Sequence, residues 1–258
     1  MMDVVILAGG PTPEALAASL GESTPPERAL IEINGRPTIA YLLDSLQDIP
    51  ELGKIAVVGN ESTLAATREH APQSIGVESK STLVENVLAG AAALDSDRIL
   101  LCTCDIPLVT TATWNEFLRR VEQNSFEAAY PIVRRDTVKQ QFAEGKRTYA
   151  TLTDGTFTGG NAFVLPRANL ENLRTVIDAA YNTRKNPLAI ARILGLGFVL
   201  KAVLKKLSIH DLERKMSKVL GCRAGAVEMS DASIAFDVDK PDDFQIAQKM
   251  LASKLPSR

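Results

Sequence analysis

A glycine pair directly after a buried strand is the first feature of this sequence that could do chemistry. The apolar run 4–8 predicts a strand buried on both faces, and Gly9 and Gly10 follow it. Glycines can take positive φ angles and let a ligand approach the main chain without meeting a Cβ atom, so their N–H groups can point at phosphate oxygens. Thr12-Pro13-Glu14 suits the start of a helix, whose positive dipole end would add to an anion site.

Carboxylates follow two other predicted strands. Asp105 comes directly after the strand predicted over 98–104, at the edge where open α/β sheets bind ligands. Asp237 and Asp239 end the strand predicted over 234–238, and their spacing of two places both on one side of it. Carboxylate oxygens there suit Mg²⁺ that carries a nucleotide phosphate. We expect the cation to take Asp239, nearer the strand tips, with Asp237 as the other candidate.

Each of these features also has an interpretation without a ligand. The glycine pair could serve only the geometry of a strand-to-helix turn. Asp105 could cap a helix that starts near Thr111, and the two later aspartates could be ordinary strand-end residues. The chain has neither the G-x-x-x-x-G-K-[ST] pattern of P-loops nor the G-x-G-x-x-G pattern of dinucleotide sites, so neither of those phosphate sites is expected.

Cationic residues and a second glycine pair could hold further parts of a ligand. Arg28 follows the turn-rich segment 21–26 and could reach back to the glycine loop. Gly159-Gly160-Asn161, after a hairpin predicted over 149–158, suggests another close approach of backbone to ligand. A basic group could form a phosphate-holding face or an ordinary solvated loop; it comprises Arg134, Arg135, Lys139, Lys146 and Arg147.

The elements that must position these residues alternate between strand and helix patterns. Further strands are predicted over 55–59, 75–77, 128–133, 162–165 and 227–229, and helices over 13–20, 37–46, 62–70, 83–94, 113–123 and 241–254. Thr82 and Glu85 form a capping box at the start of one helix. This alternation predicts an α/β domain with a parallel sheet and right-handed crossovers.

Composition narrows the class of protein. With 258 residues, 45% of them apolar, the chain can bury a full core, and we expect a single domain over 1–258. A formal net charge of -2 gives no reason to expect nucleic acid as a partner. The 3 cysteines lack C-x-x-C spacing, which argues against a disulfide framework or a zinc site. No signal peptide or transmembrane segment is visible, so we expect a cytoplasmic protein.

One stretch, 168–221, is helical almost throughout in pattern. Ser208 and Asp211 form another capping box within it. Its middle, 189–204, is apolar but carries Arg192 and Lys201 and falls short of a membrane span. Core packing, a homodimer interface and peripheral contact with a membrane surface all stay open for this stretch.

Six segments of the chain together resemble the MobA-like nucleotidyltransferase family. They are LAGG, ERALIEINGRPTIAYLLDSL, STLVENVLAGAAAL, ILLCTCDIPLVT, TGGNAFVL and DVDKPDDF. The family includes the molybdopterin guanylyltransferases, and the sugar-phosphate and methylerythritol-phosphate cytidylyltransferases are wider relatives. The resemblance implies a three-layer, Rossmann-like fold with a mixed, mostly parallel sheet, to which 168–221 would add a helical region.

The resemblance also implies a role for individual residues. A nucleoside triphosphate would bind the loop Leu7-Ala8-Gly9-Gly10, with Mg²⁺ on Asp105 and on Asp239 or Asp237. The segment that contacts the base would fall on Ser81, Thr82 and Asn86, and the acceptor side on Gly160 and Asn161. The family usually has a third glycine and an arginine after LAGG, where this chain has Pro11-Thr12-Pro13-Glu14, and Arg28 stands where a lysine is usual.

Three functions are compatible with these residues. The favoured one is Mg²⁺-dependent transfer of a nucleoside monophosphate from an NTP to a small, phosphorylated acceptor, with Arg28 on the β- and γ-phosphates and release of pyrophosphate. The second is a GT-A-like glycosyltransferase, although such enzymes tend to have D-x-D where this chain has Thr103-Cys104-Asp105. The third is an inactive nucleotide-binding regulatory protein, which the altered glycine loop suggests.

Overall fold

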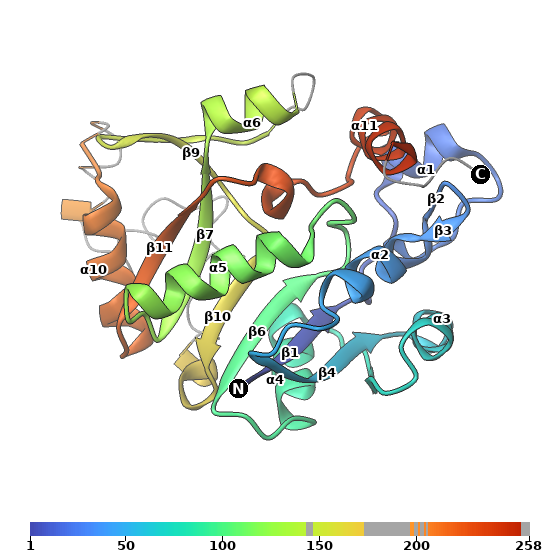
Figure 1. Cartoon of the computed structure of the whole chain (residues 1–258), viewed down its shortest axis with the longest axis horizontal. Coiled ribbons are helices and arrows are strands. Elements are labelled where there is room, and N and C mark those ends of the chain that lie inside the picture. Colours follow the sequence, from blue (N-terminus) through green and yellow to red (C-terminus); the bar gives the residue numbers. More distant parts are fainter. Residues whose placement is uncertain (143–146, 173–196, 199–200, 202–203, 205, 254–258) are drawn as a thin grey trace.

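A mixed sheet runs through the middle of the protein (Figure 1). The computed structural model describes residues 1–142, 147–172, 197–198, 201, 204 and 206–253. Within them the strand order is β5-β4-β1-β6-β10-β7-β9-β8, with β11 beside β7 and a small separate ribbon of β2 and β3. The strands are β1 Met2–Leu7, β2 Glu32–Ile33, β3 Arg36–Pro37, β4 Leu52–Gly59, β5 Ile75–Glu78, β6 Arg98–Thr103, β7 Ala128–Arg134, β8 Ala150–Leu152, β9 Gly155–Gly159, β10 Ala162–Pro166 and β11 Ala224–Met229.

Strand β1 is the centre of the parallel half because its side chains are apolar on both faces. Val4 and Val5 are fully buried and belong to two separate apolar cores, one on each side of the sheet. Strands β4 and β6 pair with β1 in parallel, so Leu7 lies opposite Val58 on one side and Thr103 on the other. The carboxyl ends of these three strands therefore meet at one edge, as the sequence predicted.

The other half of the sheet contains the reversals. Strand β10 runs antiparallel to β6 and β7, while β11 runs parallel to β7. The hairpin of β8 and β9 adds to the outer edge, with β9 antiparallel to β7. Among the described strands of this sheet, all but β9 and β10 run in the same direction. The prediction of a mixed, mostly parallel sheet is confirmed.

Helices cover both faces of the sheet and make three layers (Figure 1). Helix α4 packs on β1 and β4, and α10 lies against β11 on the same side; α2, α5 and α11 contribute to the opposite core. The helices are α1 Glu14–Leu20, α2 Thr38–Ser45, α3 Glu61–His70, α4 Leu83–Ala92, α5 Thr111–Gln123, α6 Arg135–Gln141, α10 Ile209–Leu220 and α11 Pro241–Ala252. Short 3₁₀ helices are η1 Arg28–Leu30, η2 Arg167–Asn169 and η3 Ala232–Ala235.

Outside 168–221, each predicted helix begins within two residues of the observed one, but α6 was not predicted and the expected cap of α1 differs. Capping boxes begin α4 at Thr82 and α10 at Ser208, as predicted. The expected cap by Thr12 is wrong, because Pro13 precedes α1 and no side chain caps it. The Thr12 hydroxyl instead donates to the Pro25 carbonyl at 2.6 Å, and its N–H donates to Pro26 at 2.7 Å. These bonds tie the two ends of the loop around α1 together.

The strand predicted over 234–238 is also wrong. These residues form the end of η3 and an irregular segment after it, and the N–H of Phe236 donates to the Ser233 carbonyl at 3.0 Å. The apolar side chains of Ile234 and Phe236 are buried by this tight turn rather than by strand pairing. Asp237 and Asp239 therefore do not share the face of a strand.

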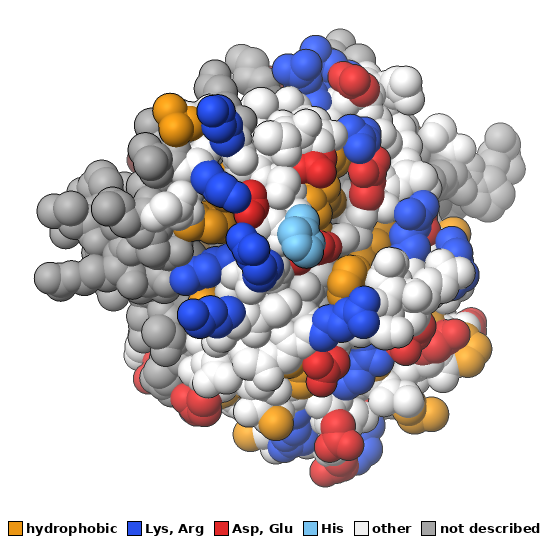
Figure 2. Space-filling model, turned by 90° about the vertical axis from the view of Figure 1, so that its left-hand side faces the viewer, with side chains coloured by type: hydrophobic (Ala, Val, Ile, Leu, Met, Phe, Trp, Pro, Cys, Tyr) orange, Lys and Arg blue, Asp and Glu red, His pale blue; other side chains and the backbone are white. Residues whose placement is uncertain are grey.

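The predicted helical region 168–221 is described only in part. Helix α10 forms its end, and most of 173–205 lies outside the described residues. Figure 2 views the molecule from the side of α10 and shows several Lys and Arg side chains on this face. Among the residues of α10, His210, Arg214 and Lys218 are exposed. None of the described helices is long and apolar enough to cross a membrane. Membrane contact, a homodimer and a single domain over 1–258 stay predictions.

Candidate active site

Asp105 lies just past the end of β6 and is held firmly in place. Its carbonyl oxygen accepts a hydrogen bond from the N–H of Val238 at 2.9 Å, and its Oδ1 accepts from the Thr103 hydroxyl at 2.6 Å. Its side chain is only 6% exposed. Thr110, rather than Asp105, caps α5, so the capping alternative is wrong. The carboxylate is left to face the carboxyl edge of the sheet through Oδ2.

The guanidinium of Arg28 joins two of the aspartates to the glycine loop. Its Nη1 donates to Asp105 Oδ2 and, at 3.2 Å, to Asp239 Oδ1. Its Nε donates to the Pro11 carbonyl at 3.2 Å, and its backbone N–H donates to the Gly10 carbonyl at 3.2 Å. Burial lowers the pKa of Arg28, but the charges of Asp105 and Asp239 outweigh burial and raise that pKa above its usual value. The Arg28 side chain stays a cation that connects Asp105 and Asp239 to the glycine loop.

Asp237 stands beside this pair with a different partner. Its carboxylate lies 3.9 Å from Arg147 Nε, and its carbonyl accepts from Arg147 Nη2 at 3.2 Å. Burial raises the pKa of Asp237 to about 6, the charges of Asp105 and Asp239 act in the same direction, and Arg147 opposes them. The structure thus brings Asp105 and Asp239 together on one nitrogen, while Asp237 belongs to the same acidic cluster but lies beside Arg147 instead of Arg28.

The first glycine pair lets neighbouring side chains pack close to the main chain and does not adopt an unusual backbone conformation. Neither Gly9 nor Gly10 has a positive φ angle, so that expectation is wrong. A Cβ on Gly9 would lie 2.9 Å from the Ser79 Cβ, and one on Gly10 would lie 3.3 Å from Arg28 Nε. The N–H of Ala8 donates to the Val58 carbonyl at 2.8 Å. Of the loop amides predicted to hold phosphate, those of the two glycines therefore remain as candidates.

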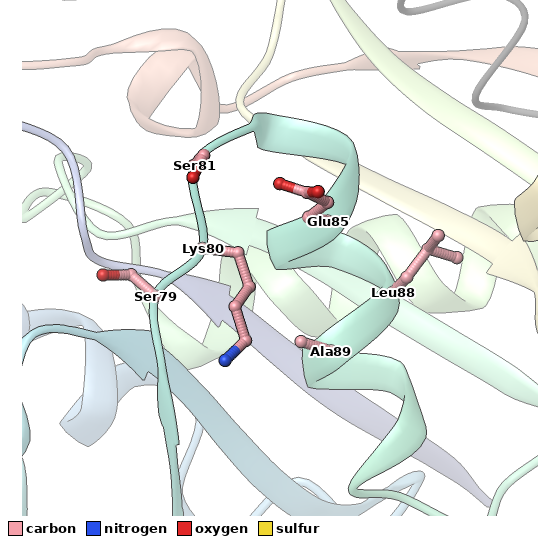
Figure 3. A pocket seen from close by; sticks show the side chains of 6 residues that line it. All are labelled: Ser79, Lys80, Ser81, Glu85, Leu88 and Ala89. Atoms are coloured by element: carbon pink, nitrogen blue, oxygen red, sulfur yellow. The ribbon is translucent and has the colours of Figure 1, made fainter.

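A pocket of about 700 Å³ lies between α4 and the segment 79–81, which follows β5; Ser79 of that segment adjoins Gly9 (Figure 3). Figure 3 shows the Lys80 side chain extending toward Ala89 of α4, Glu85 directed toward Ser81, and Leu88 directed away from Lys80. The lining residues are Ser79, Lys80, Ser81, Glu85, Leu88 and Ala89. This mixture of apolar, hydroxyl, ammonium and carboxylate groups is typical of sites for small polar ligands.

Of the three residues expected to contact a base, Ser81 lines this pocket. The other two shape the turn that forms it. The Thr82 hydroxyl accepts from the N–H of Glu85 at 3.2 Å, which caps α4. The Asn86 Oδ1 accepts from the N–H of Lys80 at 2.5 Å, which fixes the backbone of the pocket wall.

The second glycine pair is used mainly for packing. A Cβ on Gly160 would lie 2.8 Å from the Pro131 side chain, and one on Gly159 would overlap the Tyr130 hydroxyl. The N–H of Asn161 donates to the Ile234 carbonyl at 2.9 Å, and its side-chain amide lies 3.4 Å from the same oxygen. Gly160 and Asn161 thus support η3 and the segment that follows it; acceptor binding there stays a prediction.

The acidic residues can be tested for how well they fit Mg²⁺. Within the described part of the chain, no three His, Cys, Asp or Glu side chains form a metal-holding group. Asp105 Oδ2 and Asp239 Oδ1 nevertheless converge on one cationic nitrogen, so two hard oxygen donors already point at a common place. Mg²⁺ is commonly held by one or two carboxylates together with substrate phosphates and water. The pair fits that pattern provided that the Arg28 guanidinium moves aside.

Sequence reasoning missed or misplaced several residues of the site region. Ser79 and Lys80 carried no motif, although their position just before a capping box marks the start of a pocket wall. Arg147 was grouped with a basic face, yet it is directed inward, and Arg134 of that group pairs with Glu228. The carboxylates of Glu228 and Asp243 lie 94 and 96 residues from Arg134 and Arg147 in sequence, which no local pattern shows.

Comparison with known proteins places this geometry among the nucleotidyltransferases. The family model of the MobA-like NTP transferase domain matches residues 4–192. A hypothetical transferase from Thermus thermophilus is 29% identical, with a TM-score of 0.77 over 94% of this chain and 99% of that one. Among curated proteins, none matches the sequence.

Two more distant solved structures share the fold. A nucleotidyl transferase from Methanothermobacter thermautotrophicus is 17% identical, with a TM-score of 0.56 over 99% of both chains. CMP:2-keto-3-deoxy-manno-octonic acid synthetase, solved with CTP, is 12% identical, with a TM-score of 0.61 over 99% of this chain and 100% of that one. At such identities the likeness concerns the fold alone.

Proposed function

Because the chain belongs to the family of MobA-like NTP transferase domains, we propose that it transfers a nucleoside monophosphate from an NTP to a small phosphorylated acceptor. An acceptor oxygen would form a bond to the α-phosphorus, and the bond between the α-phosphorus and the bridging oxygen would break, releasing pyrophosphate. The observation that carries the proposal is the Arg28 guanidinium, whose Nη1 donates to both Asp105 and Asp239 and whose Nε lies beside Gly10.

The residues around the Arg28 guanidinium would have separate roles. The N–H groups of Gly9 and Gly10 would donate to phosphate oxygens, and the Arg28 guanidinium would bind the β- and γ-phosphates as a fork. Asp105 and Asp239 would hold Mg²⁺, which neutralises phosphate charge during transfer. A phosphate acceptor is already an anion at neutral pH, so no side chain has to remove a proton from it.

The base and the acceptor would lie on opposite sides of the glycine loop. The pocket lined by Lys80 and Ser81 would take the base, because Ser79 of the same wall adjoins Gly9. The acceptor would approach from the side of Gly160 and Asn161, where β10 joins β6. Transfer in this arrangement depends on positioning and charge neutralisation rather than on a covalent intermediate.

The experiment that tests the proposal measures pyrophosphate release with each of the four NTPs, Mg²⁺ and a panel of sugar and polyol phosphates. We expect release with at least one pair of substrates, and Asp105→Asn should lower it by about a thousandfold, as removal of one electrostatic group at a reacting centre does. Asp239→Asn should cost far more than Asp237→Asn. The exposed Asp95→Asn, which breaks only a surface pair with Lys54, is the matched control.

The other outcomes identify the alternatives. Release of a nucleoside diphosphate from a nucleotide sugar would indicate a glycosyltransferase instead. Thermal stabilisation by an NTP with no turnover in any combination would indicate a nucleotide-binding regulatory protein. Full activity of Asp105→Asn would remove that residue from the mechanism.

A further inference from the structure

Arg147 holds the segment that carries Asp237 and Asp239, although it is itself almost inaccessible. Its side chain is 7% exposed. Its Nη1 donates to Asp243 Oδ1 at 2.9 Å, and its Nη2 donates to the Asp237 carbonyl at 3.2 Å. The guanidinium also lies over the Phe236 ring, 4.4 Å from its centroid. Arg147 therefore fixes the start of the segment at two consecutive residues.

Asp243 extends this hold to the other end of the segment. Its side chain is 1% exposed, and its Oδ2 accepts from the N–H of Lys240 at 3.2 Å, at the start of α11. Between the two ends, the N–H of Val238 donates to the Asp105 carbonyl at 2.9 Å. The short stretch that carries Asp239 is therefore held by hydrogen bonds at Asp237, at Val238 and at Lys240.

We propose that Arg147 is a positioning residue that fixes the backbone of 236–240 so that Asp239 meets Asp105 at a common cation. The inference rests on the proposed function and deepens it. It assigns different tasks to the two arginines of the region. Arg28, with 26% of its side chain exposed, can exchange its carboxylate partners for ligand phosphates, whereas Arg147 is too buried to reach a ligand and keeps the acidic segment in place.

The buried charges explain why the segment depends on this arginine. Asp243 is almost fully enclosed, and a buried carboxylate without its cation is strongly unfavourable. If Arg147 is removed, Asp243 loses its cation and is drawn toward water. That movement releases the Lys240 end of the segment, and with it the position of Asp239.

The test measures how tightly Arg147→Met, Arg147→Lys and the wild type bind Mn²⁺–tripolyphosphate, with water-proton relaxation as the readout. Tripolyphosphate represents the part that all NTPs share. Arg147→Met should weaken this binding by about tenfold or more, the range seen when a residue that orients a metal ligand is lost. Arg147→Lys should fall between, because one ammonium cannot reproduce the fork that reaches Asp243 and a carbonyl together. In turnover, kcat should fall more than KM for the NTP rises.

A matched control separates positioning from general stability. Arg98 also binds a carboxylate, that of Glu122, and a backbone carbonyl, that of Phe126 at 3.1 Å, away from the site. Arg98→Met should lower the melting temperature yet leave Mn²⁺–tripolyphosphate binding unchanged.

The outcomes decide between the two proposals. The role of Arg147 is overturned if Arg147→Met binds Mn²⁺–tripolyphosphate as tightly as the wild type, or if Arg98→Met loses as much affinity. If Arg147→Met does not fold, the same binding is measured with Asp243→Asn. Weaker binding is expected for this variant, and unchanged binding would contradict the role. If the wild type binds Mn²⁺–tripolyphosphate more tightly than Arg147→Met but releases no pyrophosphate with any substrate pair, the proposed function fails while the positioning role stands.

Discussion

The two glycine pairs, Gly9-Gly10 and Gly159-Gly160, look alike in sequence but do different work. Both stand at the ends of strands and both suggested close approach to a ligand. At the first pair a Cβ would meet Ser79 and the Arg28 side chain, which belong to the pocket and the candidate site. At the second pair a Cβ would meet Tyr130 and Pro131 of β7. The first pair adjoins the candidate site, and the second packs strand against strand.

This difference shows that a glycine can support a candidate site from a distance, because the absence of its Cβ lets a neighbouring segment pack close to it. Gly160 lies close to the Ile234 carbonyl, and Asn161 donates to that same oxygen. The chain then passes in a few residues to Asp237 and Asp239. The second pair thus supports the segment that leads to Asp237 and Asp239, while the first pair packs against Ser79 and Arg28 of the candidate site.

The largest effect should follow Gly159→Ala. The added methyl overlaps the Tyr130 ring, which is stacked on Phe163 with 4.7 Å between centroids and cannot move without disturbing that stack. Such overpacking should lower the free energy of unfolding by about 2–3 kcal/mol, measured by urea denaturation. The double variant with Tyr130→Ala should regain part of the loss. A fully stable single variant would contradict the packing role.

Gly10→Ala should separate binding from stability. The three atoms nearest to the added Cβ all belong to the Arg28 side chain, the closest at 3.3 Å, and this side chain can shift, so the free energy of unfolding should fall by less than about 1 kcal/mol. The same methyl stands where a phosphate bound by Arg28 would approach, so NTP affinity should fall by about tenfold, or about 1.4 kcal/mol. Calorimetric titration measures this, and unchanged affinity would place the triphosphate elsewhere.

An effect of similar size, dependent on pH, should appear at Asp237 in metal-free buffer. Its pKa is raised to about 6 from 3.8 in the fold, so as pH rises between these values the unfolded chain loses a proton that the native protein retains. The free energy of unfolding should therefore decline by about 1–2 kcal/mol as pH rises through 6. Asp237→Asn should remove that decline, whereas Asp95→Asn should retain it. Denaturation in urea at pH 5 and pH 8 measures the difference.

The smallest change is expected for Asn161→Ala. The backbone bond from Asn161 to Ile234 stays, and only a side-chain contact of 3.4 Å is lost, so the free energy of unfolding should change by about 0.5 kcal/mol. If the side chain also binds the acceptor, KM for the acceptor should rise while KM for the NTP does not. Equal rises in both would argue against an acceptor role.

The sequence was informative wherever a short-range signal decides the structure. Five consecutive apolar residues placed the central strand, and capping boxes at Thr82 and Ser208 marked two helix starts correctly. It failed where distant contacts decide. The apolar run before Asp237 resembles a strand, but the bond from Asn161 to Ile234 and the tight turn around Ser233 hold it as a 3₁₀ helix.

The same limit explains the candidate site. Asp105 could be singled out because a carboxylate after a buried strand is itself a local signal. The role of Arg147 depends on Asp243, which is 96 residues further along the chain, and on a ring that covers its guanidinium. Such a pairing follows from the folded structure and from no spacing rule.

The position of Arg28 between two carboxylates has a consequence for the order of events at the site. The acidic pair already has a counterion tethered to the same chain, so the ligand-free protein needs no metal to relieve repulsion between Asp105 and Asp239. Under the proposed function, ligand capture would be an exchange of partners rather than an addition of charge. A divalent ion arriving alone would have to compete with the guanidinium, whereas a triphosphate would offer Arg28 a new anion and free both carboxylates at once.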